Sequence, residues 1–282
     1  MSMKSENKPD ASWLAYKANE LRILALEMAL RAGGGHLGGA FSVIDVITAL
    51  YFRILNHDPK NPSWPERDRL LFSKGHSCLA LYTALAETGY FEKERLERFC
   101  VDDGLLAGHP ERELVPGVEI TAGSLAHGLP IAVGMALAAK IDKKEHKIYA
   151  VLSDGECNEG STWEAIMSGA QLGLDNLTLI IDNNRFISLG PLAEIMNVEP
   201  LGDRMRDFGW GVEVIDGHDM GQIVSALEKI PFEAGKPSVI VSNTVKGKGV
   251  SFMENVAMWH YRGMNEEEAE IASRELKEAL GK

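Results

Sequence analysis

Three carboxylates stand close together in the segment SDGECNEG, residues 153–160, directly after an apolar run. Asp154, Glu156 and Glu159 fall within six positions. Like charges at such spacing repel one another unless a cation, a hydrogen-bond donor or water separates them. Taken alone, Asp154 is most simply a turn residue or a helix cap. A bound cation is the alternative, and the surrounding residues decide between the two.

A calcium-binding loop starting at Asp154 does not fit. Glu156 and Asn158 occupy suitable early positions of such a loop. However, the position that needs a glycine holds Glu159, and the position that needs a closing glutamate holds Ala165. The cluster therefore needs a partner from elsewhere in the chain.

Two glycine-rich motifs also fail as nucleotide sites. Gly33, Gly35 and Gly38 have the spacing of a dinucleotide-binding motif, but a predicted helix precedes them where that motif needs a strand. The segment KGKG, residues 246–249, lacks the ending of a phosphate-binding P-loop.

A pairing of Asp154 with Asn184 fits better. Asn184 ends the next apolar run, LTLIIDNN, and the two side chains supply a carboxylate and an amide oxygen. Hard oxygen ligands of this kind suit Mg²⁺ or Ca²⁺, and Mg²⁺ commonly completes its shell with phosphate oxygens and water. Gly155 would let backbone N–H groups approach such a phosphate closely.

The elements that must position these side chains alternate between strand and helix. Apolar runs predict strands at 69–76, 147–154, 177–184 and 237–249, with a weaker one at 210–216. Helical patterns occupy 12–31, with Ser12 as a possible cap, and 41–55, 77–90, 161–173, 219–230 and a charged terminal segment. This order predicts one α/β domain over residues 1–282, with a parallel central sheet, helices on both faces, a short N-terminal tail and a C-terminal helix. Ligands are expected beyond the carboxyl ends of the strands.

Composition narrows the class of protein. The chain has 282 residues, 45% of them hydrophobic, and a net charge of −12, which disfavours nucleic acid as a partner. Three cysteines without CxxC spacing indicate a reducing compartment. The polar start lacks an apolar signal core. The longest uncharged run, 120–139, predicts a buried loop and helix rather than a membrane span. We therefore expect a cytoplasmic protein.

The segment SDGECNEGSTWEA…NLTLIIDNNR resembles the thiamine diphosphate motif that runs from GDG to NN. The segments GGGHLGG, FSKGH, AGHPE, TAGSLAHGL, TVKGKGVSFME and WH, in this order, are similar to the amino-terminal half of transketolases. The resemblance covers roughly residues 15–264. It implies the thiamine diphosphate-binding fold, a bound Mg²⁺ or Ca²⁺, and transfer of a two-carbon ketol unit from a ketose phosphate to an aldose phosphate.

The resemblance also implies roles for individual residues. The metal ligands would be Asp154, Asn184 and the backbone carbonyl of Phe186. The cofactor would be contacted by His76, Gly123, Ser124, Leu125, Gly155, the backbone of Glu156, Asn184, Lys246 and His260. The catalytic histidines that handle substrate hydroxyls and protons would be His36, His109 and His260. Glu159 and Glu164 would lie at a contact between subunits.

Some positions depart from the family pattern. Ser153 replaces the first glycine of GDG, His127 stands where glutamine is common, and Tyr261 follows the late histidine where glycine is usual. The departures at His127 and Tyr261 leave open an uncommon acceptor substrate for the ketol unit, such as a branched sugar phosphate.

Transketolases continue into a pyrimidine-binding domain and a carboxyl-terminal domain, which carry the glutamate that activates the cofactor and most sugar-phosphate arginines. No residue here corresponds to them, so the resemblance implies the amino-terminal subunit of a split transketolase. A separate carboxyl-terminal subunit would complete an α2β2 assembly. Two alternatives stay open: another thiamine diphosphate enzyme, acting on 2-oxoacids, acetoin or deoxyxylulose phosphate, and a cofactor-binding chain without catalysis.

Overall fold

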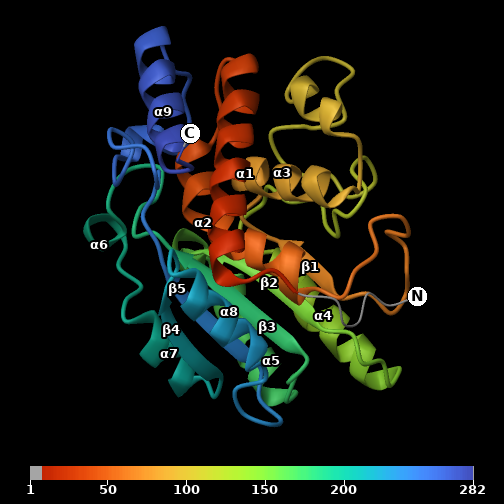
Figure 1. Cartoon of the computed structure of the whole chain (residues 1–282). Coiled ribbons are helices and arrows are strands. Elements are labelled where there is room, and N and C mark those ends of the chain that lie inside the picture. The colour runs from red at the N-terminus through yellow and green to blue at the C-terminus, as the bar shows by residue number, and fades with distance from the viewer. Residues whose placement is uncertain (1–7, 282) are drawn as a thin grey trace.

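A computed structural model describes residues 8–281. The fold is built on a five-stranded parallel sheet with the strand order β1-β2-β3-β5-β4 (Figure 1). The strands are β1 Arg69–Phe72, β2 Ile148–Ser153, β3 Leu177–Asn183, β4 Gly211–Asp216 and β5 Ser238–Asn243. The helices are α1 Ala11–Arg31, α2 Leu37–Ala49, α3 Cys78–Thr88, α4 Gly128–Ile141, α5 Gly160–Gln171, α6 Leu192–Ile195, α7 Leu201–Asp207, α8 Met220–Glu228 and α9 Glu266–Glu278. The predicted α/β class is confirmed. The predicted tail over residues 1–7 lies outside the described residues.

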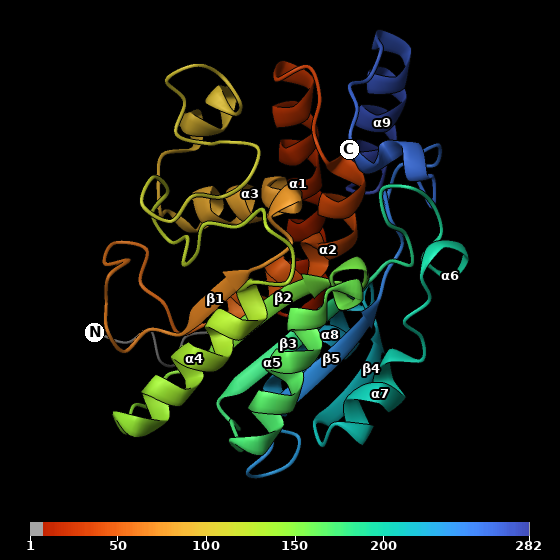
Figure 2. The ribbon, with the colours of Figure 1, turned by 180° about the vertical axis from the view of Figure 1, so that it is seen from behind.

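The strands are buried on both faces, which explains their continuous apolar sequence. In β2, Tyr149 and Val151 pack on the side of α1, α2, α3 and α8. Ile148, Ala150 and Leu152 pack on the opposite side, which α4, α5 and α7 cover (Figure 2). Because successive side chains of a strand point to opposite faces, each central strand contributes to two hydrophobic cores.

The register brings the carboxyl ends of the central strands to one edge. Ser153 of β2 pairs with Asp182 of β3, and Asn183 of β3 pairs with Asn243 of β5. Asp154, Asn184 and Thr244, which follow these strands, therefore lie at the same edge of the sheet. This is the place where open parallel sheets bind ligands.

Two predicted helix starts are wrong. Asp10, not Ser12, caps α1, because its side chain accepts a hydrogen bond from the backbone N–H of Trp13 at 2.8 Å. Helix α2 begins at Leu37, four residues before the predicted start, despite two glycines in its first turn. A Cβ at Gly38 would come within 2.7 Å of the carbonyl oxygen of Trp259, so close packing requires glycine there and overrides its weak helix propensity.

Two long apolar segments pack into the fold. Leu37–Ile54, helix α2 and its π-helical continuation, is by length and composition apolar enough to cross a membrane, but 83% of it is buried inside the fold. The run 120–139 forms the predicted loop and helix, α4. Only one side of α4 is buried, however, and Ile131 and Ile141 are exposed.

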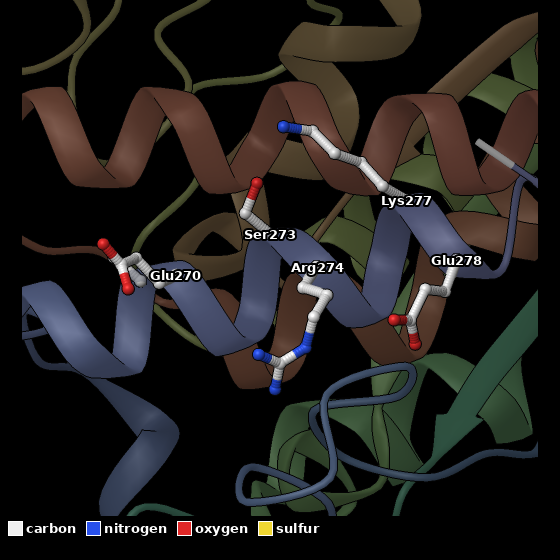
Figure 3. A pocket seen from close by; sticks show the side chains of 6 residues that line it. Glu270, Ser273, Arg274, Lys277 and Glu278 are labelled. Carbon is white, nitrogen blue, oxygen red and sulfur yellow. The ribbon is translucent and has the colours of Figure 1, made fainter.

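The charged terminal segment forms α9, as predicted. Asn265 caps it with a capping box that includes Glu268, and Ala272 and Leu276 are buried against the rest of the fold. Its outer side carries polar and charged residues around a shallow hollow, among them Glu270, Ser273, Arg274, Lys277 and Glu278 (Figure 3). All of these residues come from one exposed helix, so they do not form a converging site.

A buried charge network connects the helical layer to the strand-end loops. Arg22 of α1 donates two hydrogen bonds to Asp45 of α2, one of them 3.2 Å long. His218, after β4, lies with Nδ1 2.8 Å from the same carboxylate, and its Nε2 accepts the backbone N–H of Val245 at 2.9 Å. The network therefore ties α1 and α2 to the loop that follows β5.

Replacing Asp45 should reveal how much this network stabilises the fold. We expect Asp45→Ala to lower the free energy of unfolding by about 3–5 kcal/mol, because it leaves the buried Arg22 guanidinium unpaired. Urea denaturation followed by circular dichroism measures the loss. The control is Glu27→Ala, which removes an exposed ion pair with Arg31 on α1 and should cost under about 0.5 kcal/mol. Equal losses in the two variants would contradict the prediction.

Candidate active site

Asp154 and Asn184 are buried at the carboxyl ends of β2 and β3. Asp154 Oδ1 accepts the N–H of Gly155 at 2.8 Å, and Oδ2 accepts the N–H of Arg185 at 2.5 Å. Asn184 Oδ1 accepts the N–H of Phe186 at 3.1 Å. Burial, with a smaller contribution from Asp182, raises the pKa of Asp154 to about 7. The predicted metal ligands therefore meet in one loop junction, in a setting that disfavours an uncompensated carboxylate.

Asp182 was not among the predicted site residues, and the structure places it at the centre of this junction. Its carboxylate forms a buried ion pair with Lys74 and accepts hydrogen bonds from Thr244 and, at 2.6 Å, from Ser42. Asn184 Nδ2 also donates to it, at 3.2 Å. This bond turns the amide oxygen of Asn184 away from Asp182. The only sequence signal was its position at the end of a strand.

Lys246 is buried, and within residues 8–281 its Nζ forms no hydrogen bond with a carboxylate. Its Nζ lies 3.2 Å from Nδ1 of His260, and only 2% of the residue is exposed. Burial, followed by the charge of Lys74, lowers the pKa of Lys246 to about 8. An ammonium group in this setting is poorly compensated and suits an anionic ligand.

The four predicted histidines converge beside Lys246. The ring centroid of His36 lies 5.4 Å from His76, 5.9 Å from His109 and 5.2 Å from His260. Burial lowers the pKa of His36 and of His260 to about 4, and that of His76 well below its usual value. These three rings are therefore neutral at pH 7, and each can donate one hydrogen bond and accept another.

The segment Gly123, Ser124 and Leu125 lies at the rim of this cluster. All three residues are exposed, and a Cβ at Gly123 would lie 3.6 Å from the His109 ring. Tyr261, one of the departures from the family pattern, lies against His36 with 4.7 Å between ring centroids. His127 is exposed two residues beyond this segment. The rim thus combines the predicted aminopyrimidine contacts with two of the unusual residues.

The carboxylates of SDGECNEG separate in the structure. Glu156 is fully buried, its amide donates to Ser153 Oγ at 3.3 Å, and its side chain points to other partners. Glu159 and Glu164 are exposed around the start of α5. Their predicted place at a subunit contact stays a prediction.

The donor set fits a diphosphate with a divalent metal ion. Among residues 8–281, no three His, Cys, Asp or Glu side chains are grouped to hold a metal. A metal ion here would therefore rely on Asp154, an amide oxygen and a backbone carbonyl, which are ligands that Mg²⁺ accepts. The ammonium of Lys246 and the imidazoles beside it supply donors for an anion.

Residues 15–281 match the family model described as "Transketolase, thiamine diphosphate binding domain". The chain belongs to the transketolase family. The predicted family and the predicted thiamine diphosphate-binding fold are thereby confirmed. The residues of the strand-end site described above all fall within the matched range, and the role of each residue stays a prediction.

Two similar transketolases have about the length of this chain. One is the 6-deoxy-6-sulfo-D-fructose transketolase subunit SqwG of Clostridium sp. (strain MSTE9), 45% identical over 94% of this chain and 96% of the relative. The other is one of the subunits of the apulose-4-phosphate transketolase of Phocaeicola vulgatus, 42% identical over 95% of both chains. Both are named as subunits, as the resemblance predicted for this chain.

A single-chain transketolase has the same fold over its matching part. The crystal structure of transketolase from Campylobacter jejuni superposes with a TM-score of 0.87 at 34% identity, over 94% of this chain. This chain covers 42% of that longer one. It therefore corresponds to one part of a complete transketolase.

The buried Lys246 ammonium leads to a prediction on stability. We expect Lys246→Met to raise the free energy of unfolding at pH 7 by on the order of 2 kcal/mol, because the folded chain no longer buries a charge. The folded pKa of about 8 lies below the ordinary value of 10.5. The parent therefore binds fewer protons when folded between these values, and its stability rises with pH across that interval. The gain should shrink toward pH 10.5.

Urea denaturation at pH 7 and pH 10 measures both effects. Lys229→Met is the control, because its side chain is 59% exposed and its replacement should leave stability nearly unchanged. A Lys246→Met variant less stable than the parent at pH 7 would show that the ammonium is compensated in the folded chain.

Proposed function

We propose that this chain holds thiamine diphosphate and a divalent metal ion, Mg²⁺ or Ca²⁺, at the carboxyl ends of its strands. The observation that carries the proposal is the junction in which Asp154 accepts the amide of Arg185, next to Asn184. That junction joins the two ends of the thiamine diphosphate motif. The uncompensated ammonium of Lys246 and the neutral histidines supply the donors that an anionic cofactor needs.

The residues would divide the work between them. Asp154, the amide oxygen of Asn184 and the carbonyl of Phe186 would hold the metal ion. Gly155, the backbone of Glu156, His76, Lys246 and His260 would bind the diphosphate, while Gly123, Ser124 and Leu125 would contact the aminopyrimidine. When bound, thiamine diphosphate supplies a nucleophilic carbon and takes up the electron pair of the broken carbon–carbon bond.

The histidines would orient the sugar and move its protons. His36, His109 and His260 would contact substrate hydroxyls, and an imidazole ring can accept a proton from one oxygen and return it to another. The reaction is transfer of a two-carbon ketol unit from a ketose to an aldose. A general base works best with a pKa near the operating pH, so the pKa of about 4 for His36 and His260 would have to rise beside the anionic cofactor.

A separate subunit would complete the site. The relatives that match this chain over their whole length are named as subunits. Exposed apolar side chains stand beside the site, including Leu125, Leu189, Met258 and Tyr261, and would be covered by a pyrimidine-binding domain. We propose a partner with pyrimidine-binding and carboxyl-terminal domains, assembled as α2β2 in the cytoplasm. Neither nucleic acid nor a membrane enters the proposal.

The substrate would be a phosphorylated or sulfonated ketose. The names of the two relatives refer to a sulfonated fructose and to apulose 4-phosphate, neither of which is a sugar of the standard transketolase reaction. His127 and Tyr261, at the rim, are the residues that we propose to select the sugar.

Replacing Asp154 tests the metal assignment. We expect Asp154→Ala to weaken Mg²⁺-dependent binding of thiamine diphosphate at least about 100-fold, because it removes the only carboxylate of the proposed ligand set. Titration calorimetry with and without chelator measures this, and circular dichroism checks that the fold is retained. Asp216→Asn, at the end of the edge strand β4, is the matched control and should bind like the parent. Unchanged affinity in Asp154→Ala would refute the assignment.

Reconstitution tests the split enzyme. The chain alone should show no ketol transfer, and transfer should begin when the partner subunit is added. The assay combines ketose phosphates, 6-deoxy-6-sulfo-D-fructose and, in separate reactions, pyruvate as donors with a panel of aldose phosphates, including branched ones.

Three results of this assay would contradict the proposal. Robust ketol transfer by the isolated chain would remove the need for a partner. Consumption of pyruvate without ketol transfer would favour another thiamine diphosphate reaction. Cofactor binding without any activity in the assembled complex would favour a chain without catalysis.

A further inference from the structure

Glu156 is the one buried carboxylate of the SDGECNEG segment that faces away from the proposed metal site. Its Oε1 accepts the hydroxyl of Ser73 at 2.5 Å and the backbone N–H of Ala126 at 3.0 Å. Its Oε2 accepts the backbone N–H of Ser153 at 2.9 Å. The side chain therefore joins the ends of β1 and β2 to the segment that precedes α4.

Helix α4 lacks a cap of its own. His127, at the capping position, makes no capping hydrogen bond with its side chain. Instead, the backbone N–H of Gly128 donates a hydrogen bond to Ser73 Oγ at 3.3 Å, and the Ser73 hydroxyl in turn donates one to the carboxylate of Glu156. A carboxylate near the amino end of a helix satisfies free N–H groups and interacts favourably with the helix dipole.

The backbone at Ala126 requires such an anchor. Its φ of 64° lies in the left-handed region, which carries an energetic cost for a residue with a Cβ. The hydrogen bond from its amide to Glu156 offsets that cost and holds the turn. The rim segment Gly123 to Leu125 directly precedes this turn, so its carboxyl end is held by Glu156.

The amino end of the rim segment is held independently. The N–H of Ala122 donates to the carbonyl of Pro110 at 3.0 Å. Ala122 also packs against Gly75, where an added Cβ would come within 2.9 Å of the Ala122 side chain. The rim segment is thus fixed at both ends, and only the carboxyl end depends on a side chain from the SDGECNEG loop.

We propose that Glu156 is a positioning residue that sets the distance between the two ends of the cofactor site. Its backbone belongs to the turn Asp154–Asn158, which holds the metal and diphosphate end, and its side chain holds the rim segment that meets the aminopyrimidine. The inference rests on the proposed function for the identity of the ligand. It gives the side chain of Glu156 a role in addition to the proposed contact between the Glu156 backbone and the diphosphate.

Binding of two ligands by the full-length chain with its partner tests the inference. The ligands are thiamine diphosphate and inorganic diphosphate, each with Mg²⁺. We expect Glu156→Ala to raise the Kd for thiamine diphosphate about 10-fold, as loss of one well-formed contact does, while the Kd for inorganic diphosphate changes less than about 2-fold. Glu156→Gln keeps an oxygen for Ala126 and should recover most of the loss.

Asp68→Ala is the matched control. Asp68 also accepts two backbone N–H groups, those of Asn56 at 2.9 Å and Lys147 at 2.7 Å, but at the opposite end of β1 and β2. The variant should lower the melting temperature and leave the ratio of the two Kd values unchanged. A general loss of stability would therefore not imitate the effect expected for Glu156.

Hydrogen exchange of the chain gives a readout that does not need the cofactor. Amides of residues 120–129 should exchange faster in Glu156→Ala than in the parent, with no such change in Asp68→Ala. Equal weakening of both ligands, or unchanged exchange in this segment, would overturn the inference. A parent complex that binds neither ligand would instead refute the proposed function, while the exchange result would still decide the link between Glu156 and the rim segment.

Discussion

The buried ion pair between Lys74 and Asp182 is the interaction on which the candidate site depends. Two charges in a dry interior are stable only when their remaining hydrogen-bonding groups are also satisfied. Here Ser42, Thr244 and Asn184 all donate to the carboxylate of Asp182. Together with Lys74 and Asp182 themselves, these donors come from α2, from β3 and from the loops after β1, β3 and β5. One carboxylate therefore aligns the elements that form the candidate site. It also orients the amide oxygen of Asn184, which the proposed metal needs.

Two charged groups around this ion pair, Asp154 and Lys246, are poorly compensated by the other residues of the chain. Burial raises the pKa of Asp154 to about 7 and lowers that of Lys246 to about 8. A cation beside Asp154 and an anion beside Lys246 would relieve both effects. Titratable groups held in unfavourable surroundings are typical of functional sites, where stability is given up for binding. The neutral rings of His36 and His260 belong to the same imbalance.

The departure from the family pattern at Ser153 has a structural explanation. The selectivity proposed for His127 and Tyr261 depends instead on the chemistry of the sugar, which is not part of the fold. Ser153 replaces the usual first glycine of the cofactor motif, and its hydroxyl accepts the amide of Glu156, forming a capping box. The carboxylate of Glu156 is thereby aimed at Ala126. His127 and Tyr261 are exposed, so a change of either side chain would not disturb the core.

The sequence by itself determined the alternation of strand and helix and the edge of the sheet at which Asp154 and Asn184 lie. These follow from apolar periodicity and from the order of polar residues after strands, which are local properties; the exposed edge strand β4 has the weaker pattern for the same reason. Only the tertiary structure decided that Asp182 is the centre of the junction and that Glu156 holds Ala126, thirty positions away. Those partners depend on register and packing between distant segments, where spacing along the chain does not specify which side chain meets which amide.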